Sequence, residues 1–420
     1  MKMKKLLVAI LISSMAVGLF AGCGSSTTKE TAAPTGAVEA TSTPTEKTEI
    51  NLWHYYSTEG SQLKFQEYID EFNAQSETTT VKVTVLPFAD FKTQLTIGAA
   101  ADSLPDLAMI DNCDCVAYAA MGMFEDITDV VSGWENTKNY FPEILGTCKF
   151  EDRIYALPLE SNNLEIIYNK DMLAEAGVEP PTNFEELIAA AKACTTDEHY
   201  GFALSGVESE ESTYQFLPFF WAAGGETMDL NSEAGKKVLS MFTDMINEGS
   251  MPKECISWTQ SELASQFTSG NLAMHVMGNW QLTNYKNKGI NYGVCPIPSD
   301  VTTATVYGGE NLAVIKGKHT ENATEFLKWF LDYERNSEWN LYIDHFVASE
   351  STLTDANYQS DEWKAYIDMI PNSRARDVTP NWPEISVGYQ KAIQGALSGV
   401  TSVDEALSGG QKIIDEANAQ

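Results

Sequence analysis

The chain has few basic residues and, after its first 20 positions, no long apolar run. It carries 27 Lys and Arg against 59 Asp and Glu, which gives a net charge of −32 over 420 residues. Nucleic-acid binding needs a basic patch, so this balance argues against nucleic acid as a partner. An apolar run of about 20 residues is needed to cross a bilayer. No later segment reaches that length, and the body of the chain is not expected to span a membrane.

Metal and catalytic motifs are also lacking. Apart from Cys23, six cysteines are scattered through the chain rather than concentrated as in a small disulfide framework, so their pairing stays open. Cys113 and Cys115 are one residue apart, whereas zinc and redox motifs have two residues between cysteines, and the five His are isolated. No Gly-x-Ser-x-Gly or phosphate-loop motif occurs. We therefore expect no metal, no cofactor and no enzymatic activity.

The first 22 residues have the layout of a secretory signal. Three lysines come first, an apolar stretch covers residues 6–20, and Ala21 and Gly22 precede Cys23. This ending resembles the lipobox of bacterial lipoproteins, although Phe20 stands where leucine is commonest. The resemblance implies that the Cys23 sulfur is acylated and that Cys23 becomes the mature N-terminus. The alternative is an ordinary cleaved signal followed by a coincidental cysteine.

The segment 23–46 continues with Ser, Thr, Ala, Pro and Gly and has no large apolar side chain after Cys23. Such a segment does not bury enough surface to fold, so it is expected to be a flexible tether. Without residues 1–22, which hold three lysines and no acidic residue, the net charge is −35. An acidic body is repelled by anionic lipid, so the N-terminal lipid alone would attach the protein to the cell membrane, outside the cytoplasm.

About 370 residues follow the tether, which is too many for one compact core and predicts two domains. Strands are expected at 49–54, 81–85 and 107–110, with helices at 61–75 and from Asp90 to Gly98. This order predicts an α/β fold with a parallel sheet covered by helices. Later strands are expected at 155–160, 164–168, 272–277 and 292–296, and helices at 183–194, 233–248, 321–332 and 384–397. Ligands bind such sheets at the carboxyl ends of the strands, here at 54–57 and 111–112.

Ten sequence blocks resemble the family 1 extracellular solute-binding proteins, the group that includes maltose-binding protein. They run in family order at residues 50–55, 104–112, 153–158, 167–177, 200–203, 216–225, 267–274, 278–281, 308–314 and 380–385. The resemblance implies a two-lobed periplasmic-binding-protein fold of type II, with a ligand cleft between the lobes. It implies an N-terminal lobe of 47–158 plus 309–358 and a C-terminal lobe of 163–305 plus 365–420. The chain would cross between them at 158–163, at 305–310 and within 355–370.

The same resemblance implies a sugar ligand, an ABC permease as partner and a monomeric protein. A sugar ring has apolar faces that stack on aromatic side chains and hydroxyls that need fixed donors and acceptors. Trp280 matches the position where the family commonly stacks a sugar ring. Other candidate platforms are Tyr214, Trp221 and Trp382, for which a place in the core is the alternative; Trp53 fits a core strand equally well.

Polar candidates come from the strand ends and from the crossovers. Asp111 and Asn112 directly follow a buried strand, and Asn162 matches a family contact position. The glycines at the second crossover would let the backbone approach a ligand closely. The full set of polar candidates is Tyr55, Ser57, Asp111, Asn112, Asp114, Glu160, Ser161, Asn162, Gly308, Gly309, Glu310, Arg374 and Arg376.

Three other functions are alternatives to sugar capture for an ABC importer. A glycosidase needs two carboxylates at a fixed separation, and Asp111 with Glu310 is the pair that could be imagined for it. A non-sugar solute such as a phosphate would call for arginine or a helix N-terminus in the cleft. The protein could also present its ligand to a membrane sensor instead of a permease. The sequence does not distinguish this role from transport.

Overall fold

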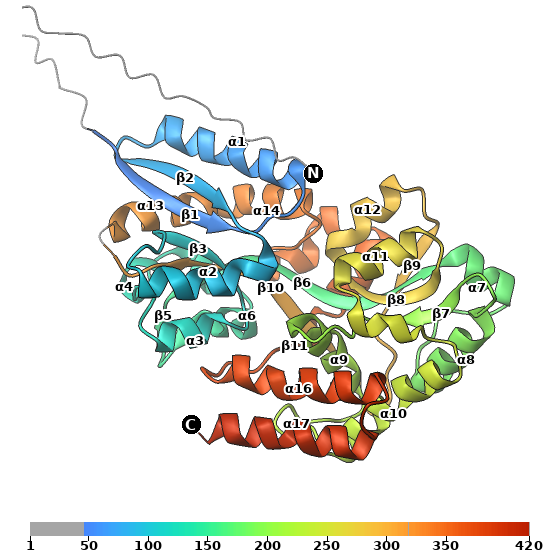
Figure 1. Ribbon diagram of the computed structural model, residues 1–420. Coiled ribbons are helices and arrows are strands. Elements are labelled where there is room, and N and C mark those ends of the chain that lie inside the picture. Colours follow the sequence, from blue (N-terminus) through green and yellow to red (C-terminus); the bar gives the residue numbers. More distant parts are fainter. Residues whose placement is uncertain (1–45, 318, 420) are drawn as a thin grey trace, which may run out of the picture. The chain divides into compact units, whose positions relative to one another are not determined.

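The computed structural model describes residues 46–317 and 319–419 (Figure 1). The predicted signal peptide of 1–22, the lipidation site Cys23 and almost all of the tether of 23–46 lie outside these residues. Within the described ranges, no helix has both the length and the apolar character needed to cross a membrane.

The described chain is organised around a nine-stranded sheet of order β2-β1-β3-β10-β6-β8-β7, with β11 on β10 and β9 on β6. β1 pairs in parallel with β2 and β3, whereas β10 runs antiparallel to both β3 and β6. The strands are β1 Thr48–His54, β2 Thr79–Val85, β3 Leu107–Asp111, β6 Ala156–Asn169, β7 Tyr200–Ala203, β8 Leu272–Gly278, β9 Tyr292–Cys295, β10 Thr305–Val314 and β11 Ser373–Ala375; β4 Lys149–Phe150 and β5 Arg153–Ile154 form a separate pair.

Helices connect and cover the strands (Figure 1). α1 packs on β2 and α13, and α16 packs against α9, α10 and α17. The helices are α1 Glu59–Gln75, α2 Phe88–Ala100, α3 Cys115–Ala120, α4 Thr128–Val131, α5 Glu135–Asn139, α6 Pro142–Gly146, α7 Lys170–Ala176, α8 Phe184–Cys194, α9 Glu210–Ala222, α10 Glu233–Asn247, α11 Gln260–Thr268, α12 Leu282–Asn287, α13 Thr320–Phe330, α14 Tyr333–Tyr342, α15 Asp361–Asp368, α16 Trp382–Leu397 and α17 Val403–Asn418. Short 3₁₀ helices are η1 Lys253–Ser257, η2 Asn279–Gln281, η3 Glu350–Thr354, η4 Ala356–Tyr358 and η5 Ile370–Asn372.

The buried side chains form two large cores. The first core draws on residues 50–159 and 307–370, and we call the elements around it the first lobe. The second core draws on residues 164–306 and 382–417, and its elements form the second lobe, with a small third cluster beside β8. Cys113 is the exception, because its chain neighbours belong to the first lobe while its side chain is buried in the second core. β6 and β10 contribute side chains to both large cores and therefore join the lobes.

Most expected elements are present within one or two residues of their predicted bounds, and three details differ. The segments expected as two strands, 155–160 and 164–168, form the single long strand β6. Pro158 fits inside β6 because the register with β10 shifts between Glu310 and Asn311, and a bulge tolerates a residue without an N–H. Asp90 lies in the first turn of α2 instead of capping it, since the cap position is Pro87. The chain leaves the first core after Ile370 and enters the second at Trp382, so the third crossover runs through β11, later than the expected 355–370.

Candidate functional site

Three acidic side chains lie side by side on adjacent strands where the lobes meet. β10 pairs with β3 and β6 so that Glu310 is opposite Asp111 on one side and opposite Glu160 on the other. The sequence places these residues more than 40 positions apart, and only the crossing of β6 and β10 through the sheet brings them together. All three belong to the predicted polar set.

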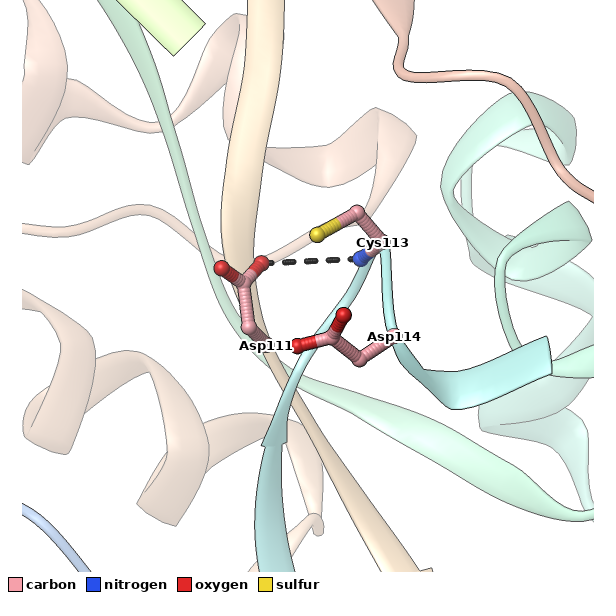
Figure 2. Close-up of side chains that lie close together, drawn as sticks. All are labelled: Asp111, Cys113 and Asp114. Carbon is pink, nitrogen blue, oxygen red and sulfur yellow. Dashed lines mark hydrogen bonds between the residues drawn. The ribbon is translucent and has the colours of Figure 1, made fainter. Parts of the chain in front are cut away.

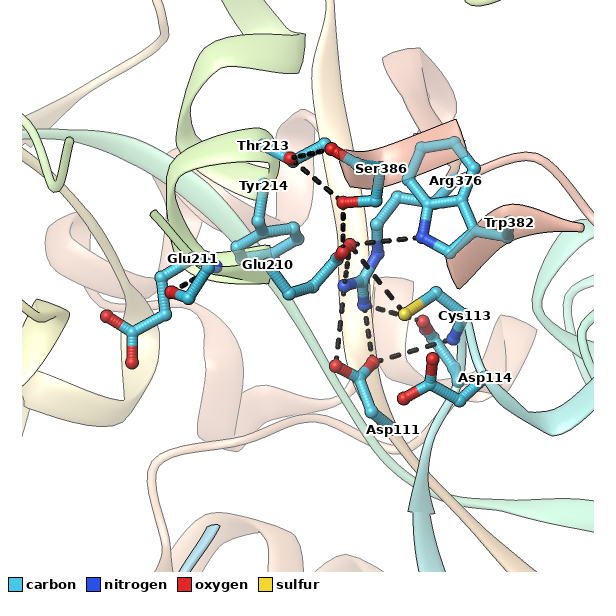
Figure 3. A network of polar contacts seen from close by, with 12 residues as sticks. Asp111, Cys113, Asp114, Glu210, Glu211, Thr213, Tyr214, Arg376, Trp382 and Ser386 are labelled. Atoms are coloured by element: carbon cyan, nitrogen blue, oxygen red, sulfur yellow. Dashed lines mark hydrogen bonds and ion pairs between the residues drawn. The ribbon is translucent and has the colours of Figure 1, made fainter. Parts of the chain in front are cut away.

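Arg376, which follows β11, binds the first of these carboxylates and connects it to the second lobe (Figure 3). Its Nη2 donates to Asp111 Oδ1 at 2.6 Å and to Asn112 Oδ1 at 2.8 Å, and its Nη1 donates to Glu210 Oε1 at 3.0 Å. The guanidinium also lies over the Tyr214 ring, 4.8 Å from its centroid. Because Asp111 belongs to the first lobe and Glu210 opens α9 of the second, Arg376 bridges the two lobes.

The network around Glu210 extends into the second core. Glu210 accepts hydrogen bonds from Trp382 Nε1 at 3.1 Å, from the Ser386 hydroxyl and from Cys113 Sγ at 3.7 Å. Only 3% of the Arg376 side chain is exposed, against 13% for Asp111 and 11% for Glu210. Two carboxylates and one guanidinium are thus held together in a largely dry environment, where an unpaired charge is costly.

Charge pairing in this region separates the pKa values of two neighbouring aspartates. Burial by itself would raise the pKa of Asp111, but Arg376 and Lys92 lower it below its ordinary value. Burial raises the pKa of Asp114 to about 6, although Lys92 opposes the shift through an ion pair of 2.7 Å. Figure 2 shows the two carboxylates with Cys113 between them in the chain. Burial, opposed by Arg376, also raises the pKa of the Cys113 thiol well above its ordinary value.

Glu160 and Glu310 form a second acidic group in which aromatic side chains provide the donors. Glu160 Oε2 accepts from Tyr56 Oη at 3.0 Å and from Trp339 Nε1 at 3.3 Å. Glu310 Oε1 accepts from Tyr55 Oη at 3.3 Å. Burial, followed by the neighbouring Glu160 carboxylate, raises the pKa of Glu310 well above its ordinary value.

Two further contacts join the lobes beside this group. The Trp280 ring, in η2 of the second lobe, stacks on His345 of the first lobe at 6.3 Å between centroids and 22° between planes. Asp344 accepts from the Thr283 backbone N at 2.8 Å and hydroxyl at 2.9 Å, which ties the same first-lobe loop to the start of α12. Trp280 is half-buried, and its six-membered ring also packs against Gly278, where a Cβ would lie 1.7 Å from Cζ3.

The two glycines of β10 pack closely against other groups of the protein. A Cβ on Gly308 would lie 2.2 Å from Tyr214 Oη and 2.3 Å from Asn162 Oδ1, which are joined by a 2.8 Å hydrogen bond. Gly309 has φ +114°, and a Cβ there would lie 2.2 Å from the Glu160 carbonyl oxygen. Both positions require glycine for the packing of the protein's own groups, whereas the sequence suggested close approach to a ligand.

Several enclosed polar atoms in this region have no hydrogen-bond partner among the described residues. They are Asn112 Nδ2, Ser161 Oγ, Glu310 Oε2 and Arg376 Nε. Buried polar groups are almost always paired in folded proteins, so a concentration of unpaired donors and acceptors needs an explanation. A polar solute bound here would supply their partners.

A cavity of about 230 Å³ also lies between the lobes. It is lined by Ala117, Ala120 and Met121 at the end of α3 and by second-lobe residues of α16, α17 and the turn before α16. The second-lobe lining is Pro380, Asn381, Glu384 and Ala417.

Five candidates do not fit their expected roles as ligand contacts. Trp221 is 1% exposed and Trp382 is 0% exposed, so neither has a face free for a sugar ring. Trp221 is a core side chain, and Trp382 instead donates its Nε1 to the Glu210 carboxylate. Arg374 pairs at the surface with Glu226, 3.5 Å away. The other two residues whose placement differs are Ser57, which is exposed in the loop after β1, and Asp114, which is buried against Lys92.

Sequence reasoning missed Glu210 and His345. Glu210 follows the N-cap Ser209, and an acidic residue in the first turn of a helix is ordinarily explained by the helix dipole alone. His345 is an isolated histidine with no motif around it. Only the fold reveals that each lies against residues more than 60 positions away.

The chain is similar in sequence to known binding proteins. A family model described as "Bacterial extracellular solute-binding protein" matches residues 67–371. A putative binding protein of Brucella abortus (strain 2308) is 24% identical over 359 residues, covering 82% of this chain and 87% of the relative. Maltodextrin-binding protein MdxE of Bacillus subtilis (strain 168) is 24% identical over 386 residues, with 84% and 87% of the two chains covered.

Solved structures share the fold. An ABC transporter solute-binding protein of Thermotoga lettingae, bound with α-D-tagatose, superposes with a TM-score of 0.81 at 22% identity, covering 89% of this chain and 100% of that one. Maltose-bound MalE3 of T. maritima gives a TM-score of 0.78 at 20% identity, with 88% and 99% covered. The predicted two-lobed α/β binding-protein fold is therefore confirmed, and the family consists of binding proteins rather than enzymes. The chain belongs to the bacterial extracellular solute-binding proteins.

Proposed function

We propose that this protein captures a neutral mono- or oligosaccharide between its lobes and delivers it to the permease of an ABC importer. The observation that carries the proposal is the group of unpaired polar atoms at the lobe junction, near the half-buried side chain of Trp280. Donors are available on Asn112, Ser161 and Arg376, and the Glu310 carboxyl group, whose pKa is raised, can accept when ionised and donate when protonated. Sugar hydroxyls both donate and accept, so they match this mixed set, and the ring's apolar face matches an indole.

The charge of the region favours a neutral ligand over an anionic one. Arg376 is the guanidinium of the network, and it is already paired with Asp111 and Glu210. Lys92, the nearest lysine in the same electrostatic network, is paired with Asp114. A phosphate or carboxylate ligand would have to displace these carboxylates, whereas a hydroxyl can bond to them as they stand.

The relatives support a carbohydrate. The relatives in Bacillus subtilis include a maltodextrin-binding protein and a galactooligosaccharide-binding protein. The structures that share the fold include one that binds cyclic α-maltosyl-1,6-maltose and one in complex with cycloalternan. At 20–24% identity these ligands suggest a class and do not define the particular sugar.

The mechanism that we propose is closure around the ligand. The open and closed forms of the protein exchange. A sugar that contacts both lobes binds the closed form more tightly than the open form, and this difference in binding free energy stabilises the closed form. Arg376 and the Trp280–His345 stack already connect the lobes, so the closed form has contacts of its own. The closed monomer would then dock on the permease.

Two experiments test capture. Calorimetry and thermal shift across a panel of neutral mono- and oligosaccharides should identify a binder, and the absence of any shift would refute the carbohydrate proposal. With that binder, Trp280→Ala should weaken binding by about 2 kcal/mol, roughly thirtyfold in Kd, because stacking and buried apolar area are lost together. Trp258→Ala is the matched control, since Trp258 is also half-buried and packs against the same two clusters. Equal affinity of wild type and Trp280→Ala would remove Trp280 from the site.

We also propose that the protein is attached to the outer face of the cell membrane through acylated Cys23. The support is the sequence pattern of residues 1–23 followed by a polar tether. Expression of the full chain with a labelled fatty acid should give a labelled protein in the membrane fraction, and Cys23→Ala should abolish the label. A wild-type protein that is secreted without label would contradict lipid attachment and leave sugar capture untouched.

A further inference from the structure

Glu160, Glu310 and His345 form a compact group of potential metal ligands at the lobe junction. One ligand atom from each residue lies within 4.8 Å of the others. Glu160 and Glu310 come from the paired strands β6 and β10, and His345 from the loop after α14. Glu160 is 3% exposed and His345 is 9% exposed, whereas Glu310 is half-buried, so two of the three ligands are sheltered from solvent.

The histidine is held with one nitrogen available. His345 Nδ1 lies 2.7 Å from the carbonyl oxygen of Ile343, which only accepts. Nδ1 therefore carries the hydrogen in the neutral ring, and Nε2 keeps a lone pair. A backbone carbonyl that fixes the tautomer of a histidine in this way is the usual support for a metal-binding imidazole.

Hydrogen bonds also fix the carboxyl groups of Glu160 and Glu310. Tyr56 and Trp339 both donate to Oε2 of Glu160, and Tyr55 donates to Oε1 of Glu310. Glu310 Oε2 is enclosed and receives no hydrogen bond from a donor side chain, and its carboxyl group lies against that of Glu160, with which it can share a proton. Outer hydrogen bonds of this kind orient carboxylate ligands and are a regular part of metal sites.

No cation of the described chain neutralises this group. Arg376 pairs with Asp111 and Glu210, and neither Glu160 nor Glu310 forms an ion pair with a Lys or Arg within the described ranges. Two carboxylates in contact, away from water, repel unless a proton or a cation lies between them. A divalent ion would remove that repulsion and would bond to the unpaired Glu310 oxygen.

We propose that Glu160, Glu310 and His345 bind one divalent transition-metal ion, for which Zn²⁺ is the best match. One imidazole nitrogen and two carboxylate oxygens form a ligand set that suits zinc, whereas an all-oxygen set would suit calcium or magnesium. Three protein ligands leave a coordination position open for water or for a hydroxyl of a bound solute. Trp280 stacks on His345, so this position adjoins the proposed sugar platform. The inference shares Glu310 with the proposed sugar site and thus extends the function proposed for that cleft.

The neighbouring group of Asp111, Cys113 and Asp114 has similar spacing but is a poorer site (Figure 2). Its two carboxylates already have cationic partners in Arg376 and Lys92. The Cys113 thiol also already donates to Glu210 Oε1 at 3.7 Å, so it is engaged in the network around Arg376. This group serves as an internal comparison for the experiment.

The test is calorimetric titration of chelator-treated full-length protein with Zn²⁺, together with titration by Co²⁺ followed by visible absorption. Wild type is expected to bind one Zn²⁺, and Glu310→Gln and His345→Gln should each weaken binding at least tenfold. His319→Gln is the matched control, because His319 pairs with Asp106 at a surface position of the first lobe and should bind as wild type. Far-UV circular dichroism and tryptophan fluorescence establish that each variant is folded.

Two outcomes would overturn the proposal. Wild type that takes up no Zn²⁺ or Co²⁺ would show that a shared proton, not a metal, relieves the repulsion between the carboxylates. Zn²⁺ binding that is unchanged in both Glu310→Gln and His345→Gln would place the ion elsewhere. The glycan panel, repeated with and without Zn²⁺, separates the two proposals, since metal binding without any sugar binding refutes only carbohydrate capture.

Discussion

Replacing Arg376 by methionine should destabilise the protein far more than a typical arginine substitution. Methionine keeps most of the apolar length of the side chain and removes the guanidinium. Asp111 and Glu210 would then remain buried without their ionic partner, at 13% and 11% side-chain exposure. Removing one partner of a buried ion pair costs about 3–5 kcal/mol of unfolding free energy. Loss of the 2.8 Å hydrogen bond to Asn112 acts in the same direction.

Arg374→Met is the control, two residues earlier in the same segment. Arg374 is 42% exposed and pairs with Glu226, whose side chain is 78% exposed. An exposed pair of this kind contributes about 0–1 kcal/mol. Arg374 also lies over the Trp221 ring, 4.7 Å from its centroid, which adds about 0.5–1 kcal/mol, so Arg374→Met should cost at most about 2 kcal/mol. Urea denaturation at pH 7.5, followed by tryptophan fluorescence, measures both variants in one experiment. If Arg376→Met lowers the free energy of unfolding by no more than Arg374→Met does, the buried ion pairs of Arg376 do not contribute the stability assigned to them.

The pH dependence provides a second check on the same variant. Arg376 is one of the groups that lower the pKa of Asp111 against the effect of burial. Without Arg376 the pKa of Asp111 should rise, so acidification from pH 7.5 to 5 would neutralise the carboxylate more readily in the variant. The stability difference between wild type and Arg376→Met should therefore shrink as the pH falls. A difference that stays constant would mean that the lost stability comes from packing and not from unpaired charge.

Two further substitutions test other parts of the structure. His275 on β8 is 0% exposed and burial lowers its pKa from 6.5 to about 3, so the unfolded chain takes up a proton below pH 6.5 while the folded protein does not. Its stabilising contribution is complete above pH 6.5 and is lost as the pH falls towards 3; at pH 5 the loss is about 2 kcal/mol. Urea denaturation measures the free energy of unfolding of wild type and of His275→Phe. The difference between these two free energies should fall by about that amount between pH 7 and pH 5, and an unchanged difference would contradict the effect of burial on the His275 pKa. Gly309→Ala should lower the free energy of unfolding by about 1–3 kcal/mol or more, because φ is +114° and the new Cβ meets the Glu160 carbonyl oxygen. Gly409→Ala is the control: a Cβ there has no close neighbour in α17, so the free energy of unfolding should stay the same or rise in the same assay.

Local sequence patterns predicted the elements of the fold well. Ile50, Leu52 and His54 alternate with more exposed residues and are all buried in β1, and the apolar run of residues 107–110 is the buried strand β3. These segments were recognisable because periodicity is a property of neighbouring residues. The long strand β6 was divided in two, because Pro158 and the polar stretch from Glu160 to Asn163 resemble a break when the strand is considered without its partner β10.

The sequence also indicated some of the residues that meet at the lobe junction, and their role in ligand binding stays a prediction. Strand ends and ordered family blocks indicated Asp111, Glu160 and Glu310, whose contacts across β3, β10 and β6 the structure then displays. The tryptophans were harder, since the same residue type serves as a sugar platform or as core, and burial alone separates Trp280 from Trp221. Glu210 and His345 carry no local signal. They belong to the site only because helix α9 and the loop after α14 are brought to it by the crossing strands.

The passage of β6 and β10 through both cores has a consequence for how the protein is made. The first core needs residues 307–370 in addition to 50–159, and the second needs residues 382–417. Neither core is complete until nearly the whole chain has been synthesised, and many native contacts are distant in sequence, which slows folding. A newly made chain thus remains without a finished core for most of its synthesis. Neither lobe therefore corresponds to a contiguous fragment that can be produced alone.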